Sequence, residues 1–225
     1  MELSARINEI LASRPCCNLA TVAVADLPER ERSFFQSSRK GEWTAVALAH
    51  HITHRDEWRW YAVGADGERS PADDHLREVC RGIRDELQRA GYPAEIVAYP
   101  AESGLQFRYV AQSAGLGRIG VNAHLFHPAW GPWVHLRVMA TPAPLDIRPA
   151  VSGDAFCNRC MRCVAECPAG AIAEDTFSGA ACRAYRAAQG EYVPFGPDRE
   201  YRYCLRCLLA CPQGRRPEGF QRPCP

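Results

Sequence analysis

The sequence predicts an α+β fold followed by a separate cysteine-rich segment, and three observations favour this reading. Short apolar, β-branched runs are mixed with amphipathic helical patterns without a regular βαβ repeat, which favours an α+β sheet over a doubly wound one. The 225-residue chain is long enough for one core of about 100–200 residues plus a small module. Nine of its twelve cysteines lie in residues 157–225. We therefore expect an α+β domain over residues 1–150 and a second domain over residues 151–225.

The first elements follow from periodicity. Residues 2–13 place apolar side chains at helical spacing and predict an amphipathic helix that ends before Pro15. Residues 18–25 and 43–49 are short apolar runs and predict buried strands. The polar segment between them, residues 26–41, is expected to be a loop or a short surface helix.

The clearest helix signal begins at Ser70-Pro71, a cap followed by proline at the first helical position. Apolar residues then recur at three- and four-residue steps until Gly91. A strand closed by a glycine turn is expected before this helix, over residues 58–63. After it we expect, in order, a strand over 94–98, a helix over 105–114, a strand over 133–140 and a proline-rich linker over 141–149.

Charge and hydropathy argue against a polyanionic partner and a membrane. The chain has 27 Lys and Arg against 26 Asp and Glu, a net charge of +1, and no long run of like charges. Its first residues carry charges rather than an apolar signal region. No window reaches about 18 apolar residues. These features predict a cytoplasmic protein, and free cysteines fit that reducing compartment.

Cysteine spacing predicts two iron-sulfur clusters. A C-x2-C-x2-C-x3-C-P run is followed near the C-terminus by C-x2-C-x3-C-P, and in two-cluster ferredoxins the fourth cysteine of such a run ligates the other cluster. Zinc is the alternative, but three cysteines at this spacing followed by Cys-Pro are a poorer zinc pattern. The first [4Fe-4S] cluster is assigned to Cys157, Cys160, Cys163 and Cys211. The second is assigned to Cys167, Cys204, Cys207 and Cys182.

A glycine loop precedes these cysteines and formally matches G-x-G-x-x-G at Gly115, Gly117 and Gly120. A dinucleotide site would need a strand before the loop and an acidic residue about 20 positions after it. The preceding segment is helical in pattern, and His135 and Arg137 stand where the acid would be. The loop is therefore interpreted as a tight turn that lets backbone approach a neighbour closely.

The glycine loop and the cysteine runs together carry a specific resemblance. Residues 114–122, followed by Leu125, Pro128, Gly131 and the strand over 134–141, and then by both cysteine motifs, resemble the epoxyqueuosine reductase family, which is related to the reductive dehalogenases. The resemblance covers roughly residues 94–212. It implies a nitroreductase-like sheet domain, a ferredoxin-like double-cluster domain and a base-off cobalamin at the end of a short electron-transfer chain. The implied corrinoid contacts are Gly115, Leu116, Gly117, Ile119, Gly120 and Asn122.

The chain departs from that family at two places. Where the family carries an aspartate that donates a proton, the matching position here is Ala101. Glu102 is displaced by one residue, which in an extended segment turns a side chain to the other face. Glu102 and Tyr99 remain our candidate acids, because a proton donor must reach the reacting atom. The sequence also stops at Pro225 without the helical-repeat extension that many family members use toward tRNA, so a tRNA substrate is not expected.

Several histidines and cysteines stay outside these assignments. His50, His51 and His54 could coordinate a metal or reach the upper face of a corrinoid, or could simply end a strand in solvent. Cys80 is interpreted as a core residue, and the Cys16-Cys17 pair is left open.

The resemblance implies a corrinoid-dependent reductase. Electrons from a ferredoxin or flavodoxin would pass through both clusters to cobalamin, for the reductive cleavage of a small molecule or nucleoside. The alternative is an electron-transfer protein, or a reductive activator of a corrinoid protein, that has no substrate of its own. A flavin in the sheet domain is a further possibility. A cavity with an acid in it would favour the enzyme.

Overall fold

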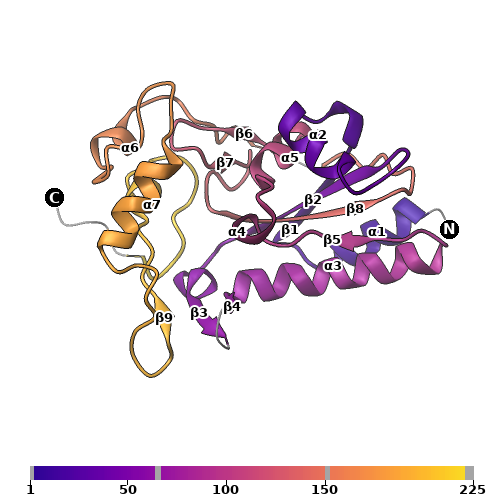
Figure 1. Ribbon diagram of the computed structural model, residues 1–225, viewed down its shortest axis with the longest axis horizontal. Helices are drawn as coiled ribbons and strands as arrows, with labels where there is room; N and C mark the ends of the chain where they lie inside the picture. Colours follow the sequence, from indigo (N-terminus) through magenta and orange to yellow (C-terminus); the bar gives the residue numbers. More distant parts are fainter. Residues whose placement is uncertain (1–2, 64–66, 150–152, 221–225) are drawn as a thin grey trace.

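The computed structural model describes residues 3–63, 67–149 and 153–220, and its centre is a four-stranded antiparallel sheet (Figure 1). The strand order is β1-β2-β8-β5. Residue pairs in register run across three strands, because Cys17 pairs with His50 and His50 pairs with His135. The strands are β1 (Cys17–Ala23), β2 (Thr44–His51), β8 (Val134–Thr141) and β5 (Glu95–Ile96). The predicted α+β class is thus confirmed, and a parallel doubly wound sheet is excluded for the described residues.

The helices α1 (Leu3–Ala12) and α3 (Pro71–Arg89) cover one face of this sheet, while α2 (Glu29–Gln36) and α5 (Phe107–Ser113) cover the other (Figure 1). The alternation of side chains along a strand divides the core accordingly. In β2, Val46 and Leu48 pack toward α3, whereas the alternating alanines between and beside them pack toward α5.

Helix α3 begins as the sequence predicts. The Ser70 hydroxyl oxygen accepts the backbone N–H of Asp73 at 3.2 Å, and Pro71 occupies the first turn. Such a cap stabilises a helix by about 1 kcal/mol. The side chains of Leu76, Ile83 and Leu87 are fully buried against the sheet. Gly91 follows the helix with φ of +85°, a conformation that favours glycine.

A second sheet joins the cysteine-rich segment to the rest of the chain. Strand β3 (Trp60–Val63) pairs on one side with β4 (Gly67–Arg69) and on the other with β9 (Glu200–Tyr201). A third sheet is the hairpin of β6 (Arg118–Ile119) and β7 (Leu125–Phe126). Strand β6 lies within the glycine loop, between Gly117 and Gly120. The cysteine-rich segment lies at the end of the molecule opposite the N-terminus (Figure 1).

The remaining elements are short. Two 3-10 helices, η1 and η2, follow β1 and β2, and four further α-helical segments complete the elements of the described residues. Their bounds are η1 (Val24–Asp26), η2 (Arg55–Trp58), α4 (Pro100–Ser103), α6 (Arg162–Ala165), α7 (Gly179–Ala188) and α8 (Arg206–Leu209). Among the described residues, no helix is both long and apolar enough to cross a membrane.

The proline-rich stretch over residues 141–149 differs from the expected linker. Ala143, Leu145 and Ile147 are buried in the core beneath α3. The backbone N–H of Ile147 donates to the hydroxyl of Thr21 at 2.8 Å, and Thr21 N–H donates to the Ile147 carbonyl at 3.0 Å. The alternation of apolar residues at every second position, rather than the prolines between them, decides how this segment packs.

Candidate functional site

Four of the predicted cluster cysteines line one small cavity. Its walls include Cys157, Cys160, Cys163 and Cys211. Burial, together with repulsion from the other three thiols of this set, raises the pKa of the Cys211 thiol to about 11. Repulsion of this kind acts only between groups that lie close together. We call these residues the first cysteine set.

The backbone between these cysteines turns unusually tightly. Arg159 and Met161 adopt positive φ values of 55° and 61° although neither is glycine. Such conformations cost of order 1–3 kcal/mol and persist only where surrounding contacts enforce them. The Arg159 side chain supplies such a contact, because its guanidinium donates to the Glu174 carbonyl at 3.2 Å and to the Asp175 carboxylate at 2.8 Å. The turn places Cys157, Cys160 and Cys163 in the lining of the same small cavity.

The other four predicted ligands line a second, much larger cavity of about 830 Å³. They come from the loop after α6, from α7 and from the segment around α8. Burial, together with repulsion from neighbouring thiols, first Cys204 and then Cys182, raises the pKa of Cys207 to about 12. The residues are Cys167, Cys182, Cys204 and Cys207. We call them the second cysteine set.

The donor sets fit iron-sulfur clusters. Each cavity presents four thiols, which is the ligand set of a [4Fe-4S] cluster. The structure brings together, in each set, the four residues that the sequence assigns to one cluster. The two cavities adjoin, because Asn122 lines both of them. The two sets are therefore neighbours, as electron transfer between clusters requires.

Residues of the sheet domain also line the large cavity, and several of them are aromatic. Asn122 lines both this cavity and the small one. Within the described part of the chain, the Asn122 side-chain nitrogen and the Arg108 Nε are buried without a hydrogen-bond partner. Buried polar atoms are almost always paired, so these two atoms favour a polar ligand in the cavity. The sheet domain contributes the aromatic residues Trp58, Trp60, Tyr99 and Tyr109, and the cysteine-rich segment contributes Tyr185, Tyr192 and Tyr203.

The two candidate acids are placed differently. Tyr99 lines the large cavity, whereas the described walls include Ala101 but not the exposed Glu102. The Tyr99 ring stacks on His135 with centroids 5.7 Å apart, and the Arg137 guanidinium lies 5.1 Å from the ring centre. Burial raises the pKa of Tyr99 well above its usual range, so its hydroxyl stays protonated.

The two residues that contact the Tyr99 ring, His135 and Arg137, belong to a buried ion-pair network with Asp73. Asp73 on α3 accepts hydrogen bonds from Arg137 Nε and Nη2, each at 2.6 Å, and lies 2.9 Å from His135 Nε2. All three side chains are nearly inaccessible to solvent. His135 and Arg137 lie at alternate positions of β8, on the sheet face that α3 covers. The contact of His135 with Asp73 on α3 therefore fixes the imidazole ring on which Tyr99 stacks.

The glycine loop packs against its own chain. A Cβ on Gly117 would lie 2.1 Å from the Phe126 carbonyl oxygen, and one on Gly120 would lie 2.3 Å from the Phe126 ring and 2.9 Å from Cys157 Cβ. These glycines therefore allow the β6–β7 hairpin to close against the first cysteine set. Of the six expected corrinoid contacts, the described wall of the large cavity includes Asn122.

The sequence analysis missed one contact of the second cysteine set. His124 Nε2 lies 3.9 Å from Cys207 Sγ, within the range of a hydrogen bond to sulfur. Burial and the nearby Arg108 lower the pKa of His124 to about 4, so the imidazole is neutral near pH 7. No local pattern pairs these two residues, which are brought together by the packing of the hairpin on the α8 segment.

The histidines near the end of β2 do not converge on one point. His51 stacks on Trp130 with centroids 5.2 Å apart, and His54 caps η2 by accepting the Asp56 N–H at 3.2 Å. His50 lies beside Cys17 instead. Burial raises the pKa of the Cys17 thiol to about 12. Cys80 is fully buried, which confirms its assignment to the core, and Cys224 lies outside the described residues.

Comparison with known proteins identifies relatives of the chain. No family model matches it. The epoxyqueuosine reductase of Gloeobacter violaceus is 32% identical over 170 residues, which cover 72% of this chain and 51% of that protein. The chain spans about half the length of this curated relative.

Solved structures agree on the fold. An epoxyqueuosine reductase crystallised with an epoxyqueuosine-modified tRNA stem loop has a TM-score of 0.62 at 20% identity, over 94% of this chain and 66% of that one. A catabolic reductive dehalogenase in complex with 3-bromo-4-hydroxybenzoic acid has a TM-score of 0.51 at 22% identity, over 75% of this chain and 25% of that one. The chain therefore belongs to the epoxyqueuosine reductase family and shares a fold with the reductive dehalogenases.

Proposed function

We propose that the chain is a corrinoid-dependent iron-sulfur reductase with two [4Fe-4S] clusters. One observation carries the proposal: a single cavity of about 830 Å³ is lined by the second cysteine set, by aromatic residues of the sheet domain and by Asn122, whose side-chain nitrogen has no hydrogen-bond partner. A cavity of this size lies in the range that holds cofactors and substrates. The sheet residues 1–150 would form the nitroreductase-like domain, and residues 151–225 the ferredoxin-like one.

The residues of this chain then have separate tasks. The first and second cysteine sets hold the clusters, and cobalamin, when bound, supplies a strongly reducing and nucleophilic cobalt. Asn122 lies where it can donate its free amide N–H into the large cavity. The neighbouring glycines keep the hairpin close to Cys157 and so hold Asn122 between the two cysteine sets.

Tyr99 is the stronger of the two acid candidates. It lines the cavity and keeps its proton, because burial raises the pKa of its hydroxyl. The stacked His135 ring and the Arg137 guanidinium fix its position. Glu102 is exposed and outside the described walls, so it would have to move to reach a substrate.

The proposed substrate is a small molecule or a nucleoside that undergoes reductive cleavage in the cytoplasm, with electrons supplied by a ferredoxin or flavodoxin. Support comes from the relatives, of which one was solved with a modified tRNA stem loop and another with a halogenated hydroxybenzoate. Because the net charge is only +1, a small substrate suits this chain better than a polyanion.

The direct test is to count metals in protein purified without oxygen from cells supplied with cobalamin. We expect about eight iron atoms and about one cobalt atom per chain, as two [4Fe-4S] clusters and one corrinoid require. Eight irons with no cobalt, even after incubation with cobalamin, would refute the corrinoid reductase and leave an electron carrier. The role of Tyr99 as the acid is then tested by Tyr99→Phe, which keeps the aromatic ring and removes the hydroxyl group that would donate the proton.

The contact between His124 and Cys207 gives a further prediction. A hydrogen bond to a ligating sulfur stabilises the more negative, reduced cluster, so its loss lowers the reduction potential. We expect His124→Leu to lower the midpoint potential of the second cluster in an anaerobic electrochemical titration. The first cluster of the same molecule is the control, and an equal shift of both potentials would contradict the assignment.

A further inference from the structure

We propose that Cys17, His50 and His75 form a transition-metal site of the kind that zinc occupies, which we call the β1–α3 site. It is built from β1, β2 and α3, on the sheet face that α3 covers. Its residues are not among the described residues that line the two cysteine cavities. The inference therefore does not depend on the proposed function.

The geometry suits a tetrahedral ion. One ligand atom from each of the three residues lies within 4.8 Å of the other two. The Cys17 Sγ and the His50 Nδ1 are 3.6 Å apart. In a tetrahedral site with Zn–S of about 2.3 Å and Zn–N of about 2.05 Å, the sulfur and nitrogen ligands are separated by about 3.6 Å. Two of the donors are thus already at the spacing that the ion imposes.

Each donor is held by an independent part of the fold. Cys17 and His50 are paired across β1 and β2, so they project from the same face of the sheet at adjacent positions. His75 belongs to α3, whose position is fixed two residues earlier by the ion pair of Asp73 with Arg137. The His75 ring centre is 4.7 Å from that of His50. Cys17 and His75 are only partly buried, which gives an ion a path from solvent.

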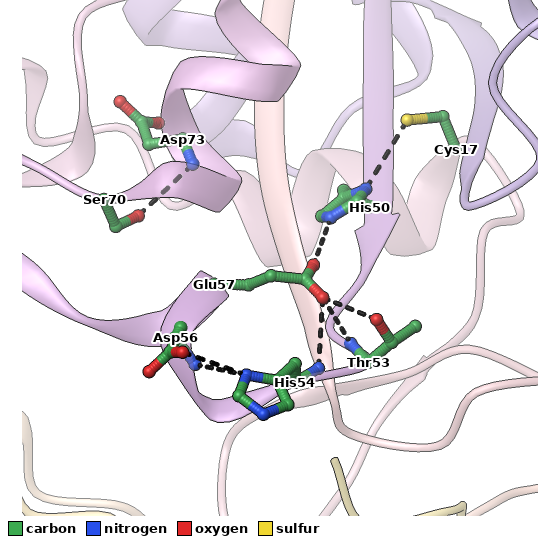
Figure 2. A network of polar contacts seen from close by, with 8 residues as sticks. All are labelled: Cys17, His50, Thr53, His54, Asp56, Glu57, Ser70 and Asp73. Carbon is green, nitrogen blue, oxygen red and sulfur yellow. Dashed lines mark hydrogen bonds and ion pairs between the residues drawn. The ribbon is translucent and has the colours of Figure 1, made fainter. Parts of the chain in front are cut away.

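The outer contact of His50 is the kind that metal-bound histidines make. Its Nε2 lies 2.7 Å from the Glu57 carboxylate (Figure 2). Glu57 is itself fixed by the backbone N–H groups of Thr53 at 3.2 Å and His54 at 3.0 Å. When the carboxylate accepts a hydrogen bond from Nε2–H, Nδ1 keeps a free lone pair, and Nδ1 is the nitrogen beside Cys17.

The ligand chemistry selects the class of metal. One sulfur and two imidazole nitrogens suit zinc and its neighbours in the first transition row, whereas calcium and magnesium prefer oxygen. Three protein ligands leave the fourth position of a tetrahedron to a water molecule. An ion bound here would link residues that are far apart in the sequence, and it would stabilise the folded chain because the unfolded chain has no such site.

The order Cys17–His50–Glu57 also matches a nucleophile, a base and an orienting carboxylate. The third donor distinguishes the two readings, because a nucleophile does not need His75 and a metal does. The β1–α3 site is therefore the reading that uses every residue of the cluster.

The test uses the full chain with its cysteine sets first loaded with iron without oxygen, so that the cluster thiols are occupied. Calorimetric titration with Zn²⁺ should show about one strong site per chain. His75→Gln is expected to weaken this site at least about 100-fold, and Glu57→Gln about 10- to 100-fold. His54→Gln is the matched control, because this exposed histidine belongs to the same region without being a donor, and it should bind zinc like the wild type.

Scattering at the zinc edge locates the ion in wild-type crystals, independently of any variant that fails to fold. We expect a peak about 2.3 Å from Cys17 Sγ and about 2.0–2.1 Å from one nitrogen of each histidine. Wild-type protein with full iron content that binds no zinc would overturn the proposal. So would zinc binding that His75→Gln leaves unchanged. Rapid alkylation of Cys17 in the absence of a zinc site would establish the nucleophile instead. Iron is counted before the zinc titration, so the occupancy of the cysteine sets is known. Cobalamin binding is measured in a separate experiment, and its failure would not affect the zinc result.

Discussion

Replacing Cys182 by alanine is expected to halve the iron content, from about eight to about four atoms per chain. Cys182 lines the large cavity together with the rest of the second cysteine set, and Cys204 and Cys167 contribute to its raised pKa after burial. Loss of one of four thiolates removes the cluster unless another ligand replaces it. The measurement is iron analysis with electron paramagnetic resonance of the dithionite-reduced protein, which should retain the signal of the first cluster.

Cys80→Ala is the matched control for this experiment. Cys80 lies on the fully buried face of α3 and belongs to neither cysteine set. Its replacement should leave about eight irons, although it removes a buried sulfur from the core. If Cys182→Ala also kept all its iron, Cys182 would not be the fourth ligand of the second cluster.

Replacing Asp73 by alanine is expected to lower the free energy of unfolding by about 3–5 kcal/mol, because it leaves the buried charge of Arg137 unpaired. The Arg137 and Asp73 side chains are 5% and 2% exposed, respectively. Urea unfolding of the cluster-loaded protein, followed by tryptophan fluorescence, measures the change. The adjacent Asp74→Ala is the control, since Asp74 pairs with Arg69 at the surface, 2.8 Å away, and such pairs contribute at most about 1 kcal/mol.

The network of Asp73, His135 and Arg137 also predicts how the free energy of unfolding depends on pH. Burial alone would raise the pKa of Asp73, but hydrogen bonds from His135 and Arg137 hold it far below the usual range. A carboxyl group with a lowered pKa in the folded state stabilises the protein above its unfolded pKa, and this contribution is lost as the pH falls toward the folded pKa. Below about pH 4, wild-type stability should therefore fall more steeply than that of Asp73→Asn. Parallel slopes for the two proteins would contradict this assignment.

Local patterns in the sequence predicted the main elements of the fold. Helix α3 follows from its cap and its apolar spacing, and strands β2 and β8 follow from short apolar runs. The cysteine spacing likewise indicated which thiols could meet, because ligands two residues apart on a turning backbone share a centre. The prediction of a linker over residues 141–149 was wrong. It rested on the prolines of this stretch, whereas the apolar residues at alternate positions pack into the core.

By itself, then, the sequence determined what depends on near neighbours: helix starts, strand faces and the spacing of the cysteines. Only the tertiary structure decided which distant residues meet. Tyr99 stacks on His135, His124 reaches Cys207, and Cys17 meets His50 and His75. Each of these contacts is set by strand register or by the packing of one element on another, which local spacing does not encode because several registers and packings satisfy the same pattern.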